Sequence, residues 1–290
     1  MLLKYLNFIG RAVIHNNTPD RLFTLRDLGL LKVSGPGALK LLQGQLSCDM
    51  EAMLPGTGAM GAHCNPQGRV ISLFYAARIH DDFYLAMPLP LIPIAMSALK
   101  KYAPFFKAEV QDASGSYQII GATEIPHAIL PDAVIKLPSH TNRKILLVQT
   151  VATLEQEAAE HWKLLDMREG IPAIYPQTSG KFLPHDLNLP ALNAVSFSKG
   201  CFTGQEIIAR MQYRGKPKNH LYRGLSSAAL QPGEQLFLNE KPAGTVIDCC
   251  QNVYNDQYAL LLTTDETTAQ QHQLQTEQSH LIELQKSEES

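Results

Sequence analysis

The sequence lacks the cysteine pattern of a disulfide-stabilised or zinc-binding protein. It has five cysteines, an odd number, and no two of them form a C-x-x-C pair. We therefore expect neither a disulfide framework nor a metal site, and this cysteine usage favours a reducing cytoplasm. No run of residues approaches the ~18 apolar residues of a membrane span, so no membrane contact is predicted. The apolar N-terminus is interrupted by Lys4 and Asn7, and we expect no signal peptide there.

An excess of charge of one sign is also missing. The chain carries 25 Lys and Arg residues against 27 Asp and Glu residues, which gives a formal net charge of −2. The overall charge therefore does not attract nucleic acid, and any contact with a polyanion must be local. Hydrophobic residues make up 45% of the chain and charged residues 18%, which is typical of a globular protein. The 290 residues are ample for two or three domains.

The first two thirds of the chain combine strand-like and helix-like patterns, which predicts an α+β fold. Strands are expected from alternating or β-rich stretches, and helices from apolar residues repeated every three or four positions. The expected strands lie in 22–33, with a bend at Gly29, and in 70–78, 82–87, 105–121 and 133–150; helices are expected after Ser34 and over 91–103 and 153–168. Residues 173–193 are expected to form a long loop, and loops of that length are usually functional.

The last part of the chain has a different character. From about His220 onwards, short strand-like runs are separated by turn residues, which predicts a small all-β barrel or sandwich. Cys249 and Cys250 are adjacent within one of these runs. Since neighbouring side chains of a strand point to opposite faces, we expect no metal or disulfide shared between them.

The stretch S-K-G-C-F-T-G-Q-E carries the clearest local signal in the chain. Thr203 and Glu206 have the spacing of a capping box, and the apolar residues that follow predict a helix over about 204–212. Cys201 lies just before this helix and close to Lys199 in sequence, and unpaired N–H groups and a cation both favour a thiolate. Cys201 is therefore our candidate for a reactive thiol. The alternative is a glycine-rich turn in which the cysteine is a small buried residue.

The motif K-G-C-F-T-G-Q-E, with the Tyr-Arg-Gly-Lys run at 213–216, resembles the signature of the folate-binding YgfZ family. These proteins are relatives of the glycine-cleavage T-protein and function in iron–sulfur cluster biogenesis and tRNA modification. A second block, Q-G-Q-L-S-C-D at 43–49, is also similar to a block of that family. The resemblance spans roughly residues 22–262.

The resemblance implies a particular α+β fold. It is the T-protein-like ring, in which two α+β domains and a C-terminal all-β barrel surround a central folate cavity. In this chain the folate-binding region would be residues 1–218, with two discontinuous subdomains that switch near positions 50 and 120. The barrel domain would then be residues 219–290.

The resemblance also implies a function and a set of site residues. The protein would be a tetrahydrofolate-binding accessory protein in iron–sulfur cluster assembly or repair, supporting iron–sulfur enzymes that include tRNA-modifying ones. Its partners would be folate and those enzymes or assembly proteins. Cys201 would be the reactive thiol or a transient cluster ligand. The implied folate-binding residues are Trp162, which is the single tryptophan of the chain, Lys199, Gly200, Gln205, Glu206 and Arg214.

Four positions depart from the patterns of these relatives. Leu28 stands where the family has a second aromatic residue, and Arg168 where T-protein relatives often have a pterin-binding Glu. Ser72 and Leu73 stand where T-protein carboxylates assist aminomethyl transfer, and serine is not an anion near neutral pH. A working aminomethyltransferase is therefore disfavoured, although a folate-dependent one-carbon transferase remains the main alternative.

An RNA-binding factor is the third hypothesis. The segment 199–223 contains six Lys and Arg residues and one acidic residue, Glu206. Such a run is either a solvated basic face or an anion-binding surface for a folate tail, an RNA backbone or an acidic partner. The near-neutral charge of the whole chain argues against RNA binding, whereas the local basic run supports it.

Overall fold

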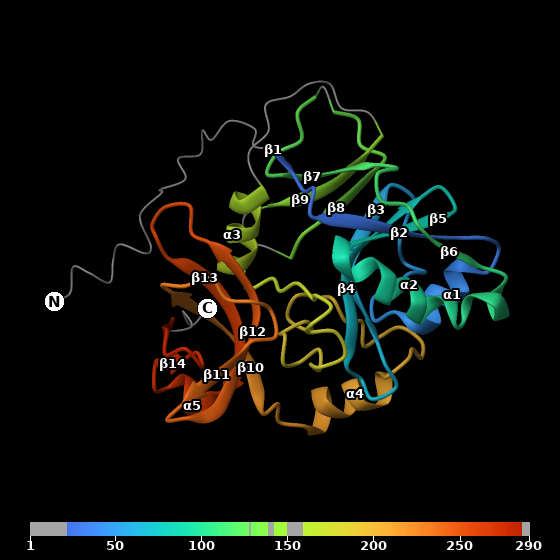
Figure 1. Cartoon of the computed structure of the whole chain (residues 1–290). Helices are drawn as coiled ribbons and strands as arrows, with labels where there is room; N and C mark the ends of the chain where they lie inside the picture. The colour runs from blue at the N-terminus through green and yellow to red at the C-terminus, as the bar shows by residue number, and fades with distance from the viewer. Residues whose placement is uncertain (1–21, 128, 139–141, 150–158, 286–290) are drawn as a thin grey trace.

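The structure is a computed structural model that describes residues 22–127, 129–138, 142–149 and 159–285. The N-terminal stretch and the first part of the helix expected over 153–168 lie outside the described residues. A nine-stranded sheet and a closed six-stranded barrel form most of the fold. Helix α3 (Ala159–Glu169) lies between them, as Figure 1 shows.

The sheet contains the first nine strands, in the order β1-β7-β9-β8-β3-β4-β5-β2-β6. Its neighbouring strands are antiparallel, except that β3 and β8 run parallel. The strands are β1 (Leu22–Thr24), β2 (Leu28–Ser34), β3 (Thr57–Cys64), β4 (Val70–Ile79), β5 (Asp82–Pro88), β6 (Glu109–Asp112), β7 (Gln118–Ala122), β8 (Ala133–Lys136) and β9 (Lys144–Val148).

The parallel pair joins two antiparallel halves of the sheet that interleave along the chain. Strand β1 lies in one half with β7, β9 and β8, whereas β2 to β6 form the other half. The hairpin expected over 70–87 is confirmed, because Ile79 pairs with Asp82 across a tight turn. The bend expected at Gly29 is wrong: Gly29 pairs regularly with Met87, and the chain turns earlier, at Arg26. The division into subdomains near 50 and 120 stays a prediction.

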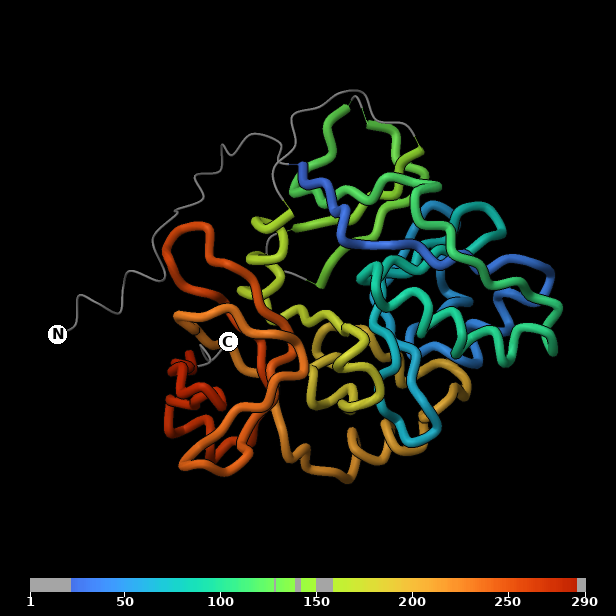
Figure 2. The backbone as a smooth tube through the Cα atoms, in the orientation of Figure 1, coloured from blue at the N-terminus to red at the C-terminus, as the bar shows by residue number. Residues whose placement is uncertain are grey.

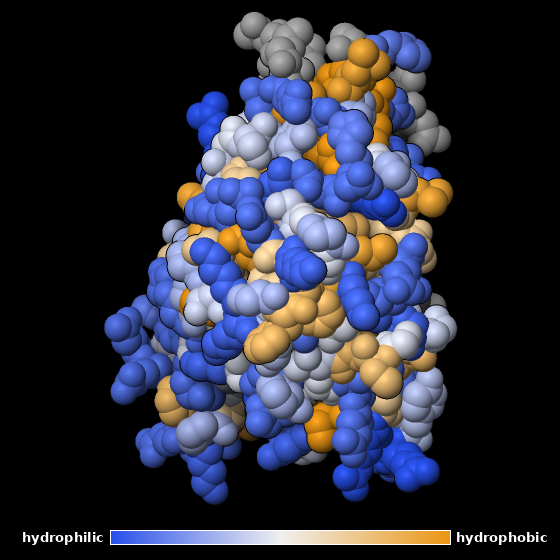
Figure 3. Space-filling view, turned by 90° about the vertical axis from the view of Figure 1, so that its right-hand side faces the viewer, coloured by the Kyte–Doolittle hydropathy of each residue, from blue (hydrophilic) through white to orange (hydrophobic). Residues whose placement is uncertain are grey.

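Two helices pack their apolar residues against this part of the fold. Helix α1 (Ala38–Gln45) buries Leu41 and Leu42, and helix α2 (Ile92–Lys100) buries Ile92 and Leu99. The helix expected over 91–103 is thus confirmed in a shorter form. Figure 3 shows the side of the molecule that carries these helices, where apolar side chains are dispersed among mostly hydrophilic ones.

The C-terminal part of the chain forms the closed barrel, in the strand order β10-β13-β12-β11-β14-β15. The small all-β barrel expected after His220 is therefore confirmed. Its elements are β10 (Asn219–Ser226), β11 (Gln235–Leu238), β12 (Lys241–Gln251), β13 (Tyr258–Asp265), helix α5 (Glu266–Ala269), β14 (Gln273–Gln275) and β15 (Leu281–Leu284).

Strand β13 contributes to two separate cores. Leu260 and Leu262 point into the barrel core, while Ala259 and Leu261 belong to the main core of the sheet region. Alternate residues of a strand face opposite sides, so one strand can serve both cores. The barrel is therefore joined to the rest of the protein by buried apolar surface.

A long segment without helix or strand, residues 170–204, connects α3 to helix α4 (Gln205–Arg214). It includes the loop expected over 173–193. Figure 2 shows this segment, in yellow, between the barrel and the sheet. Leu187, Leu189 and Ala194 are completely buried, and backbone hydrogen bonds tie Gly180 and Phe182 to the start of β4. The loop is thus part of the packed interior rather than a surface excursion.

Candidate functional site

A narrow cavity lies where the sheet, α3, the long loop and the barrel meet. The space inside it is about 60 Å³, which is below the usual range of small-molecule sites. Residues from β4, β5 and the turn after β1 form much of its wall. Its polar and ionisable lining groups are Asp27, Tyr75, Lys163, Asp166, Tyr175 and Asp248.

One face of α3 lines this cavity. Ala159, Trp162, Lys163 and Asp166 all contribute to the lining, and their spacing of three and four residues places them on the same side of a helix. This face therefore presents an aromatic ring, an ammonium group and a carboxylate to one cavity.

Trp162 lies in the wall of the cavity and is only 3% exposed. Its ring centroid is 5.3 Å from that of Phe23, and the guanidinium carbon of Arg143 is 4.7 Å from the ring. The ring also lies against Gly121 of β7, where an added Cβ atom would come within 2.5 Å of it. Trp162 is therefore packed against Phe23, Arg143 and Gly121, and the remaining part of its ring lines the cavity.

Replacing Gly121 with alanine is expected to lower the free energy of unfolding by about 1–3 kcal/mol, because the added methyl group overpacks the Trp162 ring. The measurement is urea unfolding followed by circular dichroism. Gly44→Ala is the matched control: no atom lies within 4 Å of its Cβ position, and alanine in a helix adds roughly 0.5–1 kcal/mol of stability. Equal effects of the two substitutions would contradict this account of the Trp162 environment.

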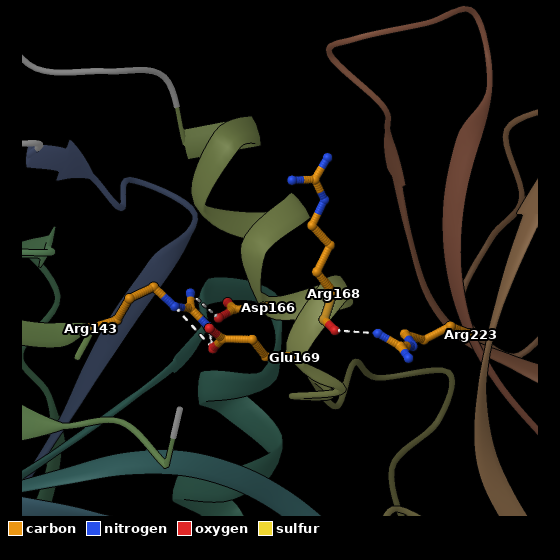
Figure 4. Close-up of polar contacts among 5 residues, drawn as sticks. All are labelled: Arg143, Asp166, Arg168, Glu169 and Arg223. Carbon is orange, nitrogen blue, oxygen red and sulfur yellow. Dashed lines mark hydrogen bonds and ion pairs between the residues drawn. The ribbon is translucent and has the colours of Figure 1, made fainter. Parts of the chain in front are cut away.

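Arg143 connects α3 to the sheet through a buried ion-pair network, drawn in Figure 4. Its side chain is completely buried. Nη1 donates to Oδ1 of Asp166 at 2.7 Å, and Nε and Nη2 both donate to Oε2 of Glu169. Burial raises the pKa of Asp166 to about 6, although Arg143 acts in the opposite direction. The network fixes the Asp166 carboxylate at the edge of the cavity.

A second polar cluster joins α3 to the barrel. Nζ of Lys163 lies 2.8 Å from Oδ1 of Asp248 and donates to the Tyr175 hydroxyl at 3.1 Å, and that hydroxyl donates to Oδ2 of Asp248 at 3.2 Å. Burial alone would lower the pKa of the Lys163 ammonium group. The nearby Asp248 carboxylate has the opposite and larger effect, so the pKa of Lys163 is raised. A register shift in β12 between Val246 and Asp248 lets Asp248 face the cavity, as bulges often do near sites.

The K-G-C motif lies elsewhere, against the end of α1. Nζ of Lys199 donates to the backbone oxygens of Gln43, Leu46 and Cys48 at 2.7–2.8 Å, so its three N–H groups cap the helix end. The two sequence blocks that resemble the YgfZ family are thus in direct contact. The expectation that the Lys199 ammonium supports a Cys201 thiolate is not met, because this cation is directed at those three oxygens.

The capping box predicted for α4 is wrong. Gly204, not Thr203, precedes the helix, and it has a positive φ of 82° with no side-chain cap. The Thr203 hydroxyl donates instead to Oε1 of Gln45. Glycine is required at 204 because a Cβ atom there would lie 2.6 Å from the Asn65 oxygen. Close packing against the β3–β4 turn therefore replaces the capping box.

Cys201 is exposed, whereas the other four cysteines are buried or half-buried. Burial raises the pKa of Cys48 to about 11 and of Cys64 and Cys250 to about 12. Cys249 packs against the barrel core and Cys250 belongs to the main core, which confirms that they point to opposite faces. Cys201 is thus the most accessible of the five thiols.

The predicted folate-binding residues fall into two places. Trp162 lines the cavity, whereas Lys199, Gly200, Gln205, Glu206 and Arg214 do not. Lys199 is buried, and the other four lie at or near the surface beside α4. A role for these five residues in folate binding stays a prediction. If they bind folate, they do so outside this cavity, because none of them lines it.

Two of the six Lys and Arg residues in 199–223 make hydrogen bonds within the protein. Lys199 binds the backbone oxygens at the end of α1, and Nη1 of Arg223 donates to the Arg168 oxygen at 2.7 Å. The remaining cations, Arg210, Arg214, Lys216 and Lys218, are exposed. An anion-binding surface would therefore be limited to α4 and the segment after it.

Within the described part of the chain, no group of three or more His, Cys, Asp or Glu side chains is arranged to hold a metal ion. Among the same residues, none of the helices has the length and apolar character needed to cross a membrane.

The fold is that of a T-protein-like protein. The chain matches the crystal structure of the glycine cleavage system aminomethyltransferase T from Bartonella henselae with a TM-score of 0.66, at 14% identity, over 94% of this chain and 87% of that one. No profile of a known protein family matches the sequence.

The protein belongs to the YgfZ family. It is 32% identical to the tRNA-modifying protein YgfZ of Klebsiella pneumoniae, over 80% of this chain and 82% of that protein. It is 31% identical to the tRNA-modifying protein YgfZ of Colwellia psychrerythraea, over 77% and 76%. An uncharacterised protein of Haemophilus influenzae is 34% identical over 70% of this chain and 72% of its own length.

Several cavity residues have no counterpart among the sequence predictions. Asp27, Lys163, Asp166, Tyr175 and Asp248 come from four parts of the chain that meet only in the folded protein. The signal that could have found two of them is the position of Lys163 and Asp166, which share a helix face with the predicted ligand residue Trp162. Two charged residues on a helix face that includes an aromatic wall residue point to a lined cavity.

Proposed function

We propose that this protein is a tetrahydrofolate-binding accessory protein that supports iron–sulfur enzymes, including tRNA-modifying ones, in a reducing cytoplasm. Membership of the YgfZ family supports the proposal, as do the names of relatives that match most of the chain. The observation that carries it is the cavity beside α3, because its lining combines aromatic walls with several carboxylates.

The lining residues fit the chemistry of tetrahydrofolate. A pterin is a flat ring with amino and N–H donors along one edge, and the carboxylates of Asp27, Asp166 and Asp248 line the cavity as acceptors. Trp162 and Tyr75 supply aromatic wall surface. Lys163 is the single cation among the described lining residues, so the anionic glutamate tail is more favourable near the mouth and solvent than inside.

An accessory role fits this lining better than aminomethyl transfer does. Bound tetrahydrofolate supplies a carrier for one-carbon units, and transfer to it needs a carboxylate that is available to the reacting amine. Leu73 lines the cavity without offering such a group. Two of the three lining carboxylates are engaged, that of Asp166 by Arg143 and that of Asp248 by Lys163 and Tyr175. Among the described residues, Asp27 is the lining carboxylate that remains for the alternative of one-carbon transfer.

The exposed thiol of Cys201 is the second functional element of the proposal. In the described residues no three-ligand group lies around it, so a cluster held by Cys201 would need further ligands from a client enzyme or assembly protein. Accessibility at the surface suits such shared ligation, and it equally suits thiol–disulfide chemistry that protects a partner's cluster.

Tetrahydrofolate is expected to quench the tryptophan emission of the protein on binding. Trp162 is the single tryptophan and lies in the cavity wall, so its emission reports on that cavity alone. The measurement is a fluorescence titration run in parallel with calorimetry. Unchanged emission despite calorimetrically confirmed binding would place the folate outside this cavity, and absence of binding by both methods would overturn the proposed function.

A further inference from the structure

Helix α4 has one face that packs against the protein and one that is open to solvent. Ile208 is 1% exposed and belongs to the main core. Arg210, Tyr213 and Arg214 are exposed, and their spacing of three and four residues groups them on the side of the helix opposite Ile208. In Figure 1 the helix lies along the lower edge of the molecule. The outer face of α4 therefore presents two guanidinium groups and an aromatic ring to solvent.

The exposed cations continue beyond the end of the helix. Gly215 leaves the helix in an extended conformation, and Lys216 precedes Pro217, which disfavours helical backbone as well. Lys216 and Lys218 are both exposed. At about 1.5 Å per helical residue and 3.3 Å per extended residue, the backbone from position 210 to 218 covers roughly 20 Å. We call these four exposed cations the α4 basic surface: Arg210, Arg214, Lys216 and Lys218.

The α4 basic surface is not neutralised by the rest of the protein. None of its four side chains forms an ion pair or a hydrogen bond with another described residue. The segment 199–223 has six basic residues and one acidic residue, Glu206, although the whole chain is slightly acidic. Charges farther away than about 8 Å are largely screened at physiological salt. The near-neutral charge of the chain therefore does not oppose binding of a polyanion at this surface.

The aromatic ring on this face favours a nucleic acid strand over an acidic peptide. Tyr213 is 71% exposed, and its ring centroid lies 6.0 Å from that of Phe197, with the ring planes at 70°. This edge contact orients the Tyr213 ring, and its exposure leaves ring surface for a stacking partner. Unpaired bases stack on such rings while neighbouring cations bind the phosphates. An acidic peptide would use the cations but would not need the ring.

We propose that the α4 basic surface and Tyr213 bind an unpaired strand of RNA. The four cations contact phosphates along the strand, and one base stacks on Tyr213. Arg210 and Arg214 can each donate two parallel hydrogen bonds to a phosphate, because the guanidinium group is a planar fork. This RNA contact goes beyond the proposed function, and the choice of RNA rather than DNA rests on the tRNA-modifying clients named there.

The experiment titrates the full chain into a fluorescein-labelled RNA of about 12 nucleotides without internal pairing. Fluorescence anisotropy gives the affinity at salt concentrations between about 50 and 300 mM. Four phosphate contacts predict that the logarithm of the association constant falls with the logarithm of the salt concentration with a slope of about −3. Replacing all four residues of the α4 basic surface with glutamine should bring the slope close to zero and weaken binding roughly 100-fold at about 150 mM salt.

A matched control removes the same number of charges elsewhere. Four exposed lysines that lie outside 199–223 are replaced with glutamine in one variant: Lys100, Lys101, Lys136 and Lys241. This variant has the same net charge as the first, yet it should keep the affinity and the salt slope of the wild type. Thermal unfolding followed by circular dichroism establishes that both variants are folded. An equal loss of affinity in both would show a general charge effect and overturn the proposal.

Stacking is tested by Tyr213→Ala and Tyr213→Phe. Loss of the ring in Tyr213→Ala should weaken RNA binding roughly 5- to 100-fold without changing the salt slope, whereas Tyr213→Phe should bind like the wild type. Inorganic polyphosphate has the charges but no bases, so it should bind equally well to the wild type and to Tyr213→Ala. Unchanged RNA affinity in Tyr213→Ala would contradict the stacked base.

The remaining outcomes separate RNA from an acidic protein, and this inference from the proposed function. If polyglutamate binds the wild type as tightly as the RNA does, the surface is suited to an acidic protein and the assignment to RNA is overturned. A protein that binds tetrahydrofolate but no RNA overturns this inference alone. A protein that binds RNA in the expected manner but no tetrahydrofolate overturns the proposed function alone.

Discussion

Replacing Arg143 with methionine is expected to lower the free energy of unfolding by about 3–5 kcal/mol, which is the usual cost of removing one partner from a buried ion pair. The Arg143 side chain is completely buried between Asp166 and Glu169. Without it, two carboxylates remain close together in a poorly solvated place, and the cation over the Trp162 ring is lost as well. A loss of this size is a large fraction of the ~5–15 kcal/mol that typically stabilises a folded protein.

Urea unfolding of Arg143→Met measures this loss, with Arg168→Met as the matched control. Both residues are arginines beside an aromatic ring, but Arg168 is exposed. The control should therefore cost no more than about 1 kcal/mol. Adding Asp166→Asn and Glu169→Gln to Arg143→Met should recover part of the stability, because the unpaired charges are removed. If the triple variant is no more stable than Arg143→Met, uncompensated charge is not the cause.

Cys201→Ser is expected to abolish the ability of the protein to restore iron–sulfur enzyme activity in cells that lack it, while leaving tetrahydrofolate affinity unchanged. The substitution keeps the size of the side chain but removes the thiolate, which is the nucleophile and metal ligand. Cys201 does not line the cavity, so folate binding provides an internal measure of correct folding. Full restoration of enzyme activity by Cys201→Ser would contradict a functional role for the thiol.

Alkylation followed by peptide mass spectrometry tests the accessibility of the thiol directly. Cys201 should label fastest, because it is the exposed cysteine and burial raises the pKa of Cys48, Cys64, Cys249 and Cys250. Cys249→Ser is the control variant in cells, since Cys249 is half-buried against the barrel core. Slow labelling of Cys201 would show that the thiol is protected in solution.

The sequence predicts the parts of this fold whose pattern is local. The barrel follows from short alternating strands separated by turn residues, and the β4–β5 hairpin from two such runs joined by a tight turn. The capping box at Thr203 and Glu206 fails for a tertiary reason, because the approach of the Asn65 oxygen to Gly204 decides the backbone conformation. Local spacing contains no information about that contact.

The candidate site shows the same limit more strongly. Trp162 was predictable through the family resemblance, and it lines the cavity. The pairing of Arg143 with Asp166 and Glu169 joins residues more than twenty positions apart, and Asp248 reaches Lys163 from the barrel. Each of these contacts depends on how separate elements meet. No motif marks them, so their contribution to the cavity emerges only from the folded structure.

The sharing of strand β13 between two cores has a consequence for how the protein unfolds. Without the barrel, the main core would lose Ala259 and Leu261. Separating the barrel from the sheet region would expose apolar surface on both. Opening of one part therefore weakens the other, and the barrel and the sheet region should lose their structure in a single cooperative transition. A shortened chain that ends at residue 218 should accordingly be prone to aggregation, and the barrel should not be transferable as an independent module.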